Sequence, residues 1–388
     1  MTNIFVTDSQ MRSSLAVIRS LGRKGLNVIA GEETRFATGG FSKYCSGRVV
    51  YPSPIKEKNQ FVKFLLKEIQ KKEYDVIFPV ADPCLMPIID NEEEISRYTT
   101  IALPPRNIFM RGHDKGQTLK FAIDNNIPCP KTYFIEDLED IYRLENKLEF
   151  PSVIKPRIGA GKRGVRICES FQEVIDNYKN VSQRYGKIIV QEFIPNGGEF
   201  GVYTLSNHNS ELRALTVQRR IRSYPISGGP STFRETFKDE ISNKAVTYAT
   251  TLLKSMDWFG VAMVEFRIDA RNGIPKLMEI NPRFWGSLQL SILGGVDFPY
   301  LLYRMTMDGD IEPIMDYKEG VGCRWLLPGD ILWFLSAPNK LRNISTLLDT
   351  SVPDDIISFE DFGPTLGFTM ATLRYLFDRD MWKFVLRR

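Results

Sequence analysis

A hairpin-like stretch of the sequence reads GVAMVEFRID over residues 260–269 and PKLMEINPR over residues 275–283, with ARNGI between them. Side chains alternate between two faces along a strand, so Glu279 and Asn281 share one face. Arg271-Asn272-Gly273 supplies a turn in which Gly273 can adopt a positive φ. The stretch therefore predicts two antiparallel strands joined by a three-residue loop.

The register of this hairpin places two carboxylates opposite one another. Paired positions in a hairpin have a constant sum, and a loop over 271–273 pairs residue 270 with residue 274. Glu265 then lies opposite Glu279, with Cβ atoms about 5 Å apart. Two like charges at that distance are unfavourable unless a cation lies between them.

The oxygen ligands of Glu265, Glu279 and Asn281 suit Mg²⁺, with Mn²⁺ as an alternative, because Mg²⁺ keeps waters and shares its coordination shell with phosphate. The alternative interpretation is a solvated hairpin whose acids pair with Arg267 and Lys276.

A glycine-rich segment indicates a phosphate-binding loop. The sequence reads SVIKPR over residues 152–157, GAGKRG over 159–164 and VRI over 165–167. The glycines Gly159, Gly161 and Gly164 lie between two β-like pieces, which argues against a Rossmann turn or a Walker loop. We expect a hairpin lid whose backbone N–H groups fold over phosphates, with Lys155 adding a point charge. An ordinary glycine-rich surface hairpin is the alternative.

Two further segments suggest contacts to other parts of a ligand. In IIVQEFIPNGGE (188–199), the run Gln191-Glu192-Phe193-Ile194 could offer backbone groups to an adenine edge, and Glu199 could accept hydrogen bonds from ribose hydroxyls. In QRRIRSYPISGGPST (218–232), we hypothesise that Arg220 or Arg222 and the Gly228-Gly229 turn hold a substrate carboxylate. The alternatives are a buried strand and turn for the first segment and a solvated basic face for the second. Phe284 and Trp285 could form a pocket wall, although aromatic residues are more often core.

The first ~110 residues alternate short apolar strands with amphipathic helices, which predicts a doubly wound parallel sheet. The strand at 4–6 is followed by a helical run at 13–23, and a second strand begins at 27. No G-x-G-x-x-G follows the first strand, so a dinucleotide site is poorly supported. Pro104-Pro105 ends the alternation, which suggests a domain boundary nearby.

Composition excludes several classes of protein. Lys+Arg 51 against Asp+Glu 47 gives a formal net charge of +4, so bulk electrostatics does not favour nucleic-acid binding. No apolar run reaches the length of a membrane span, and the N-terminus reads as a strand and not as a signal peptide. The five cysteines are scattered and only two histidines exist, which disfavours disulfides, zinc and His-cluster sites. We expect cytoplasmic residence.

In this order the motifs resemble those of the ATP-grasp superfamily, and the likeness extends over roughly residues 1–308. The motif set is Asp114-Lys115, Ile127-Pro128-Cys129-Pro130, Val153-Ile154-Lys155-Pro156, the glycine loop, Gln191-Glu192-Phe193-Ile194, Glu199, Glu265 and Glu279-Ile280-Asn281-Pro282-Arg283. The likeness is greatest to the biotin-carboxylase- and carbamoyl-phosphate-synthetase-like branch, including D-aspartate-ligase-like carboxylate–amine ligases. An obvious bicarbonate-site signature is lacking, and the likeness does not extend beyond about residue 308.

The resemblance implies a role for each matched residue. Lys115 and Lys155 would contact ATP phosphates, Glu192 and Ile194 the adenine, and Glu199 the ribose. Glu265, Glu279 and Asn281 would hold one or two Mg²⁺ ions, and Arg283 would stabilise the charge that develops during phosphoryl transfer.

The resemblance also implies an architecture and an activity. We expect a doubly wound domain at 1–109, an ATP-grasp domain at 110–308 with subdomains at 110–190 and 191–308, and a mixed C-terminal extension at 309–388. The expected activity joins a carboxylate to an amine through an acylphosphate. Small molecules would be its partners, without nucleic acid or membrane, and a homo-oligomer is compatible with the sequence. A small-molecule kinase on the same fold and a nucleotide-binding regulatory module without turnover are the alternatives.

Overall fold

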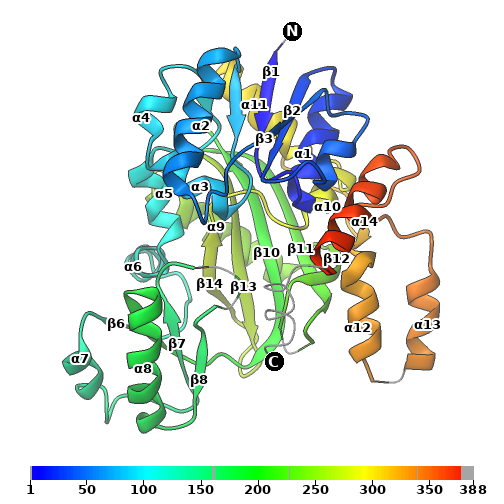
Figure 1. The fold of residues 1–388 in the computed structure, drawn as a ribbon. Coiled ribbons are helices and arrows are strands. Elements are labelled where there is room, and N and C mark those ends of the chain that lie inside the picture. The colour runs from blue at the N-terminus through cyan, green and yellow to red at the C-terminus, as the bar shows by residue number, and fades with distance from the viewer. Residues whose placement is uncertain (1, 160, 162, 227, 339, 377–388) are drawn as a thin grey trace. The chain divides into compact units, whose positions relative to one another are not determined.

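The computed structural model describes residues 2–159, 161, 163–226, 228–338 and 340–376. Figure 1 labels the helices and strands along the chain, which backbone contacts divide into two compact units. The first unit takes the described residues of Met1–Arg106, Ile221–Glu235 and Arg283–Arg388, and the second takes those of Asn107–Arg220 and Thr236–Pro282. The segment that follows residue 308 thus belongs to the same unit as the N-terminal residues.

The first unit contains a parallel sheet with the strand order β3-β2-β1-β4-β5, which confirms the predicted doubly wound fold. Its elements are β1 (Asn3–Val6), α1 (Arg12–Arg23), β2 (Asn27–Glu32), η1 (Thr38–Phe41), β3 (Gly47–Val50), α2 (Lys58–Lys71), β4 (Val76–Phe78), α3 (Asp82–Ile89), α4 (Glu92–Ile95) and β5 (Thr100–Ile101). The order of connections reverses between β1 and β4. In sheets of this kind, ligands bind beyond the carboxyl ends of the strands at such a reversal.

Burial of apolar side chains explains why these strands lie in the interior. Phe5 and Ile77, on the neighbouring strands β1 and β4, belong to one buried cluster together with Phe61 and Leu65 of helix α2. Strands covered on both faces read as short apolar runs, and the IFV and VIF runs of β1 and β4 have that character.

The rest of the first unit comes from later parts of the chain. It contains β12 (Ser231–Thr236, its last residue in the second unit), α10 (Leu288–Leu293), α11 (Phe298–Asp308), β15 (Gly322–Arg324), the π-helical turn η2 (Leu326–Asp330), α12 (Ile331–Ser336), α13 (Lys340–Leu348) and α14 (Gly363–Leu376). Strands β12 and β15 pair antiparallel, with Arg234 opposite Cys323. Helices α10 and α11 pack against α1, and α14 packs against η1. None of the described helices is both long and apolar enough to cross a bilayer.

The second unit contains antiparallel sheets. One has the strand order β6-β9-β7-β8, and in the other the neighbours run β14-β13-β10-β11. The elements are α5 (Arg106–His113, its first residue in the first unit), α6 (Lys115–Asp124), β6 (Thr132–Ile135), α7 (Leu138–Tyr142), β7 (Ser152–Pro156), β8 (Arg166–Cys168), α8 (Phe171–Tyr185), β9 (Ile188–Glu192), β10 (Asn196–Ser206), β11 (Leu212–Ser223, its end in the first unit), α9 (Glu240–Ser255), β13 (Gly260–Asp269) and β14 (Pro275–Asn281).

The glycine-rich segment joins two paired strands. Strands β7 and β8 are antiparallel neighbours, so the predicted hairpin around Gly159, Gly161 and Gly164 is confirmed. All three glycines have a positive φ, which is the conformation that favours glycine. Residues 160 and 162 of this loop lie outside the described residues.

Candidate functional site

The predicted pairing of the two glutamates is confirmed. In the β13–β14 register Glu265 lies opposite Glu279, and Met263 lies opposite Asn281. Paired residues project to the same face of a sheet, so Glu265, Glu279 and Asn281 share one face. The two carboxylates are therefore neighbours on one surface of the hairpin.

The predicted turn is wrong by one residue, and a β-bulge restores the register. Near the turn Ile268 pairs with Pro275, and the N–H of Asp269 donates to the carbonyl of Ile274. Residue 270 therefore does not pair with residue 274. The register shifts between Glu265 and Phe266, where Met278 is the extra residue of β14. A bulge of this type inserts one residue into one strand, and its location cannot be read from the spacing of glutamates alone.

A lysine from helix α6 reaches the glutamate pair. Nζ of Lys115 lies 3.2 Å from Oε2 of Glu279 and donates to the carbonyl oxygen of Gly159 at 2.6 Å. Nδ2 of Asn281 donates to Oε1 of Glu265 at 3.4 Å. Lys115 thus bridges the hairpin that carries the acids and the glycine-rich loop.

The position of Lys115 depends on two residues that the sequence analysis did not assign. Asp114 is the N-cap of α6 and accepts from the backbone N–H of Gly116. Its carboxylate also accepts two hydrogen bonds from Arg157, at 2.9 and 2.6 Å, and the N–H of Lys115 donates to the carbonyl of Arg157. A bidentate pair of this kind fixes orientation as well as distance. The sequence signal was an aspartate directly before a helix start, in Asp114-Lys115.

Lys155 on β7 belongs to the same charged group. Burial lowers its pKa to about 8; the charges of Lys115 and Arg267 act in the same direction, and those of Glu279 and Glu265 oppose them. Three cationic and two anionic side chains therefore influence one another here.

The donor set fits a divalent metal that arrives with phosphate. No group of three or more His, Cys, Asp and Glu side chains in the described part of the chain could hold a metal ion. Glu265, Glu279 and Asn281 thus supply an incomplete set of oxygen donors. Mg²⁺ accepts such a set, because it usually combines one or two carboxylates with waters and substrate phosphates.

The two glutamates expected at the adenine and the ribose are held by ion pairs. Glu192 accepts from the backbone N–H of Lys131 at 3.1 Å and pairs with Arg271 and Lys276. Burial acts to raise the pKa of its carboxyl, but the hydrogen bonds from Arg271 and Lys131 and the nearby positive charges together outweigh burial, so the pKa is lowered.

Arg267 contacts two residues of the 188–199 segment. It pairs with Glu199 and donates to the carbonyl of the buried Ile194 at 3.2 Å. Glu199 pairs with Arg220 as well. Arg267, which was weighed only as a partner for surface acids, therefore positions two of the predicted contact residues.

Arg283 lies in the first unit. Its guanidinium donates to both carboxylate oxygens of Asp82, at 2.8 and 3.2 Å, and to the carbonyl of Phe284. Asp82 begins helix α3, just beyond the carboxyl end of β4. Phe284 and Trp285 are buried core residues: Phe284 stacks on Phe78, and the ring of Trp285 meets that of Phe298 edge to face.

The residues suggested for a substrate carboxylate have separate partners. Arg220 belongs to the second unit, where it pairs with Glu199, whereas Arg222 belongs to the first unit, where it pairs with Asp330 at 3.0 Å. The N–H of Gly228 donates to the carbonyl of Pro225, so this donor closes its own turn. A Cβ on Gly229 would lie 1.9 Å from the carbonyl oxygen of Tyr224, which explains the glycine there without a ligand.

Comparison with known proteins identifies the central part of the chain. Residues 113–287 match the model of the ATP-grasp domain. The chain is 24% identical to the propionyl-CoA carboxylase alpha chain of Ruegeria pomeroyi over 52% of this chain and 31% of that protein. It is 27% identical to a D-alanine–D-alanine ligase of Wolbachia pipientis over 47% of this chain and 60% of that protein. The matches thus span less than two thirds of each of these relatives.

Solved structures show the same fold over a longer part of the chain. The biotin carboxylase–β,γ-ATP complex from Campylobacter jejuni superposes with a TM-score of 0.70 at 15% sequence identity, covering 82% of this chain and 74% of that one. At this level of identity the likeness concerns the fold alone.

Proposed function

We propose that this chain, whose residues 113–287 match the ATP-grasp domain, is an ATP- and Mg²⁺-dependent ligase that joins a carboxylate to an amine. The observation that carries the proposal is the pairing of Glu265 with Glu279, with Lys115 3.2 Å from the second glutamate. In the structure, Lys115 and Lys155 neutralise the charge of these glutamates. A triphosphate would bind the lysines in place of the glutamates, and a divalent cation would bind the glutamates in place of the lysines.

The proposed roles follow from this exchange of partners. Lys115 and Lys155 would bind phosphate oxygens, and the N–H groups around Gly159, Gly161 and Gly164 would cover them. Glu265, Glu279 and Asn281 would hold Mg²⁺, which neutralises charge on the phosphates when bound. Glu192 and Ile194 would contact the adenine through backbone groups, Glu199 would accept from the ribose, and Arg283 would bind the oxygens of the transferred phosphoryl group.

The proposed reaction has two steps. A carboxylate oxygen attacks the γ-phosphorus, so a P–O bond forms and the bond to the β-phosphate oxygen breaks, releasing ADP. The amine nitrogen then attacks the acyl carbon, a C–N bond forms, the C–O bond breaks, and phosphate and a proton leave. Such chemistry requires positioning and charge stabilisation and no protein nucleophile, which agrees with a site built from Lys, Arg and Glu.

An ADP-release screen tests the proposal and separates it from the alternatives. The purified chain is incubated with ATP, Mg²⁺ and pairs of small carboxylates and amines, and ADP, phosphate and product mass are measured. We expect ADP and phosphate only when both substrates are present, with a product whose mass is their sum less one water. A stable phosphorylated product without free phosphate would indicate a kinase, and ATP binding without turnover for every pair would indicate a regulatory module.

A further inference from the structure

Helix α14 (Gly363–Leu376), drawn in red in Figure 1, has apolar residues on two faces. One face packs against η1 of the same unit. A Cβ built on Gly367 would lie 2.6 Å from the ring of Phe41, and Ala371, one turn further along the helix, is 3% exposed. Glycine and alanine on this face therefore let α14 lie directly against η1.

The opposite face of α14 is apolar and exposed. Leu366, Met370 and Leu373 are spaced by four and three residues, so they project from one side of the helix. Their exposed fractions are 52%, 42% and 52%. Phe362, four positions before Leu366, is 52% exposed, and Phe359 is fully exposed. We call these five side chains the α14 stripe.

The α14 stripe is large for a surface that meets only water. With ~150–200 Å² for a fully exposed side chain of this size, the stripe leaves on the order of 500 Å² of apolar surface in solvent. The largest apolar patch on a typical monomer is about 300–600 Å² and is often functional. The sequence from Gly363 to Leu373 contains no charged residue, and a helix that is apolar all round is normally covered all round. The stripe therefore indicates an interaction surface.

Exposed cations lie beside the first turn of α14. The guanidinium of Arg48 lies 4.3 Å from the ring centre of Phe41, and the backbone N–H of Lys43 donates to Asp361, two residues before the helix, at 2.9 Å. The side chains of Arg48 and Lys43 are both exposed.

The acids at this end of the helix are already neutralised. Glu360 pairs with Arg23 at 2.7 Å, and Asp361 pairs with Arg19 at 2.8 Å. The charges of Arg48 and Lys43 are thus in excess there. The sequence that ends the chain is basic as well, because residues 374–388 include five basic and two acidic residues and finish with Arg387-Arg388.

We infer that the α14 stripe docks on an anionic membrane surface. A helix with an apolar face and basic flanks lies in the plane of the interface, with its apolar side chains at the acyl boundary and its cations near the lipid phosphates. The lack of a spanning run, which predicted no membrane partner, does not bear on such a helix, because a helix at the surface needs only one apolar face.

A second copy of the chain fits the stripe less well. Across a two-fold axis the same surface patch meets itself. Because both ends of α14 are flanked by basic sequence, parallel and antiparallel pairing of two such helices would each bring cations next to cations, which is unfavourable. An anionic lipid surface removes this repulsion, and it requires no groove complementary to the convex side of a helix.

Vesicle flotation of the full chain without nucleotide tests the inference. The vesicles consist of phosphatidylcholine alone or of phosphatidylcholine and phosphatidylglycerol in equal parts. We expect binding to the anionic vesicles that weakens at high salt, and little binding to the neutral ones, because the lipid charge attracts the flanking cations over a Debye length. Thermal melts check that each variant below retains its fold.

Substitutions separate the apolar and the electrostatic parts of the contact. Leu366→Ser and Met370→Ser should each weaken vesicle binding by about tenfold, since each removes roughly half of a large apolar side chain from the contact. Arg48→Gln should weaken it by about fivefold, because one cation near an anionic surface contributes that much. Ile274→Ser is the matched control, since Ile274 is 41% exposed and belongs to the second unit.

The outcomes decide between the possible partners of the stripe. Absence of binding to either vesicle overturns the inference, and so does equal binding to both vesicles or equal binding by the α14 variants and Ile274→Ser. A dimer in light scattering that both α14 variants dissociate, without vesicle binding, would assign the stripe to a second copy of the chain. ATP affinity should be the same in the wild type and the α14 variants, so the inference and the proposed ligase activity are tested separately.

Discussion

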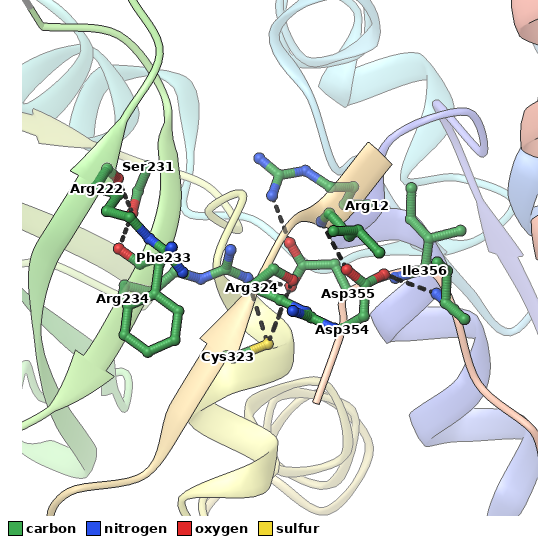
Figure 2. Close-up of polar contacts among 12 residues, drawn as sticks. Arg12, Arg222, Ser231, Phe233, Arg234, Cys323, Arg324, Asp354, Asp355 and Ile356 are labelled. Atoms are coloured by element: carbon green, nitrogen blue, oxygen red, sulfur yellow. Dashed lines mark hydrogen bonds and ion pairs between the residues drawn. The ribbon is translucent and has the colours of Figure 1, made fainter. Parts of the chain in front are cut away.

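The two units of the protein each contain a charged cluster, and the two clusters are built differently. The glutamate–lysine cluster of the second unit consists of Lys115, Lys155, Glu265 and Glu279. Its side chains are partly accessible, with 13% of Lys115 and 28% of Glu279 exposed. The arginine–aspartate network of the first unit, in which Asp355 pairs with Arg12 and Arg234 (Figure 2), is more deeply buried: Arg234 and Asp355 are 2% and 1% exposed.

The accessible cluster uses lysine as its cation and the buried network uses arginine, and this difference suits their degrees of burial. An ammonium group on a flexible stem can exchange a carboxylate for a phosphate, whereas a guanidinium held by stacking and bidentate contacts retains its orientation. The glutamate–lysine cluster is therefore suited to ligand exchange, and the arginine–aspartate network to a fixed frame. Substitutions in the glutamate–lysine cluster should therefore lower turnover, and substitutions in the arginine–aspartate network should lower the free energy of unfolding.

The largest expected effect is that of Asp355→Asn on stability. The change removes the charge that neutralises both Arg12 and Arg234, and breaking a buried pair from one side costs about 3–5 kcal/mol. Urea unfolding of the variant and the wild type would measure this change in the free energy of unfolding. Asp308→Asn is the matched control, because the Arg304–Asp308 pair is exposed and such pairs contribute about 0–1 kcal/mol.

A contrasting result is expected from Glu265→Gln in the second unit. Removal of one of two facing carboxylates should change the free energy of unfolding by no more than about 1 kcal/mol. Equal destabilisation by Asp355→Asn and Glu265→Gln would contradict the distinction between a fixed frame and an exchangeable cluster.

The next largest effect concerns turnover in Glu279→Gln. Loss of a residue that only supports a metal ligand typically lowers activity or metal affinity by about 10–100-fold, so loss of a direct ligand should lower kcat/KM by at least about a hundredfold. The melting temperature should stay close to that of the wild type. Glu145→Gln, on an exposed loop of the same unit, is the control. Full activity of Glu279→Gln at ordinary Mg²⁺ concentration would remove the proposed metal site.

Lys155→Ala is expected to weaken ATP binding without abolishing folding. A hydrogen bond to a charged group contributes about 1.5–3 kcal/mol, which corresponds to roughly a ten- to hundredfold increase in Kd. Fluorescence titration with a nucleotide analogue would measure the change, with Lys179→Ala on the exposed face of α8 as the control. Nucleotide binding that is the same in both variants would mean that Lys155 does not contact the phosphates.

The glutamate–lysine cluster could be predicted from sequence because it depends on local pairing. The constant sum of a hairpin placed Glu265 opposite Glu279, although the turn differs by one residue and the bulge at Met278 compensates for it. The parallel sheet followed similarly from alternating apolar strands and helices.

The arginine–aspartate network could not be predicted in this way. Arg12 and Asp355 are 343 positions apart in the sequence and meet only after the C-terminal segment returns to α1. No periodicity relates residues at such a separation. The hypothesis for Arg222 and Arg220 shows the same difficulty, since two arginines two positions apart have their partners in different units.

The pH dependence of ATP binding tests whether Lys155 of the glutamate–lysine cluster exchanges its partners for phosphate. The pKa of Lys155 is lowered to about 8 in the free protein, mainly by burial, so the side chain is charged below pH 8 and loses its proton above it. ATP binding favours the charged form, and Kd should therefore rise above pH 8 by up to about tenfold per pH unit. Calorimetry in buffers of different ionisation enthalpy should show proton uptake near pH 8. Lys155→Arg should flatten the profile, because arginine does not titrate in this range; a profile that Lys155→Arg leaves unchanged would assign the titration to another group.

The smallest expected effect is that of Glu199→Gln, which tests the proposed ribose contact. Both Arg220 and Arg267 already pair with this carboxylate, so the ribose hydroxyl would share an acceptor that is oriented in advance. An amide still accepts a hydrogen bond, but a neutral one, and the difference of about 1 kcal/mol predicts roughly a fivefold weaker affinity for ATP. The decisive comparison is with 2′-deoxyATP and 3′-deoxyATP in a double-mutant cycle. If Glu199 accepts from the ribose, one deoxy nucleotide should bind less tightly than ATP to the wild type and about equally to Glu199→Gln. Equal discrimination by both proteins would instead make Glu199 a positioning residue for Arg220 and Arg267, and the second unit would then contain a fixed ion-pair frame of its own beside the exchangeable cluster.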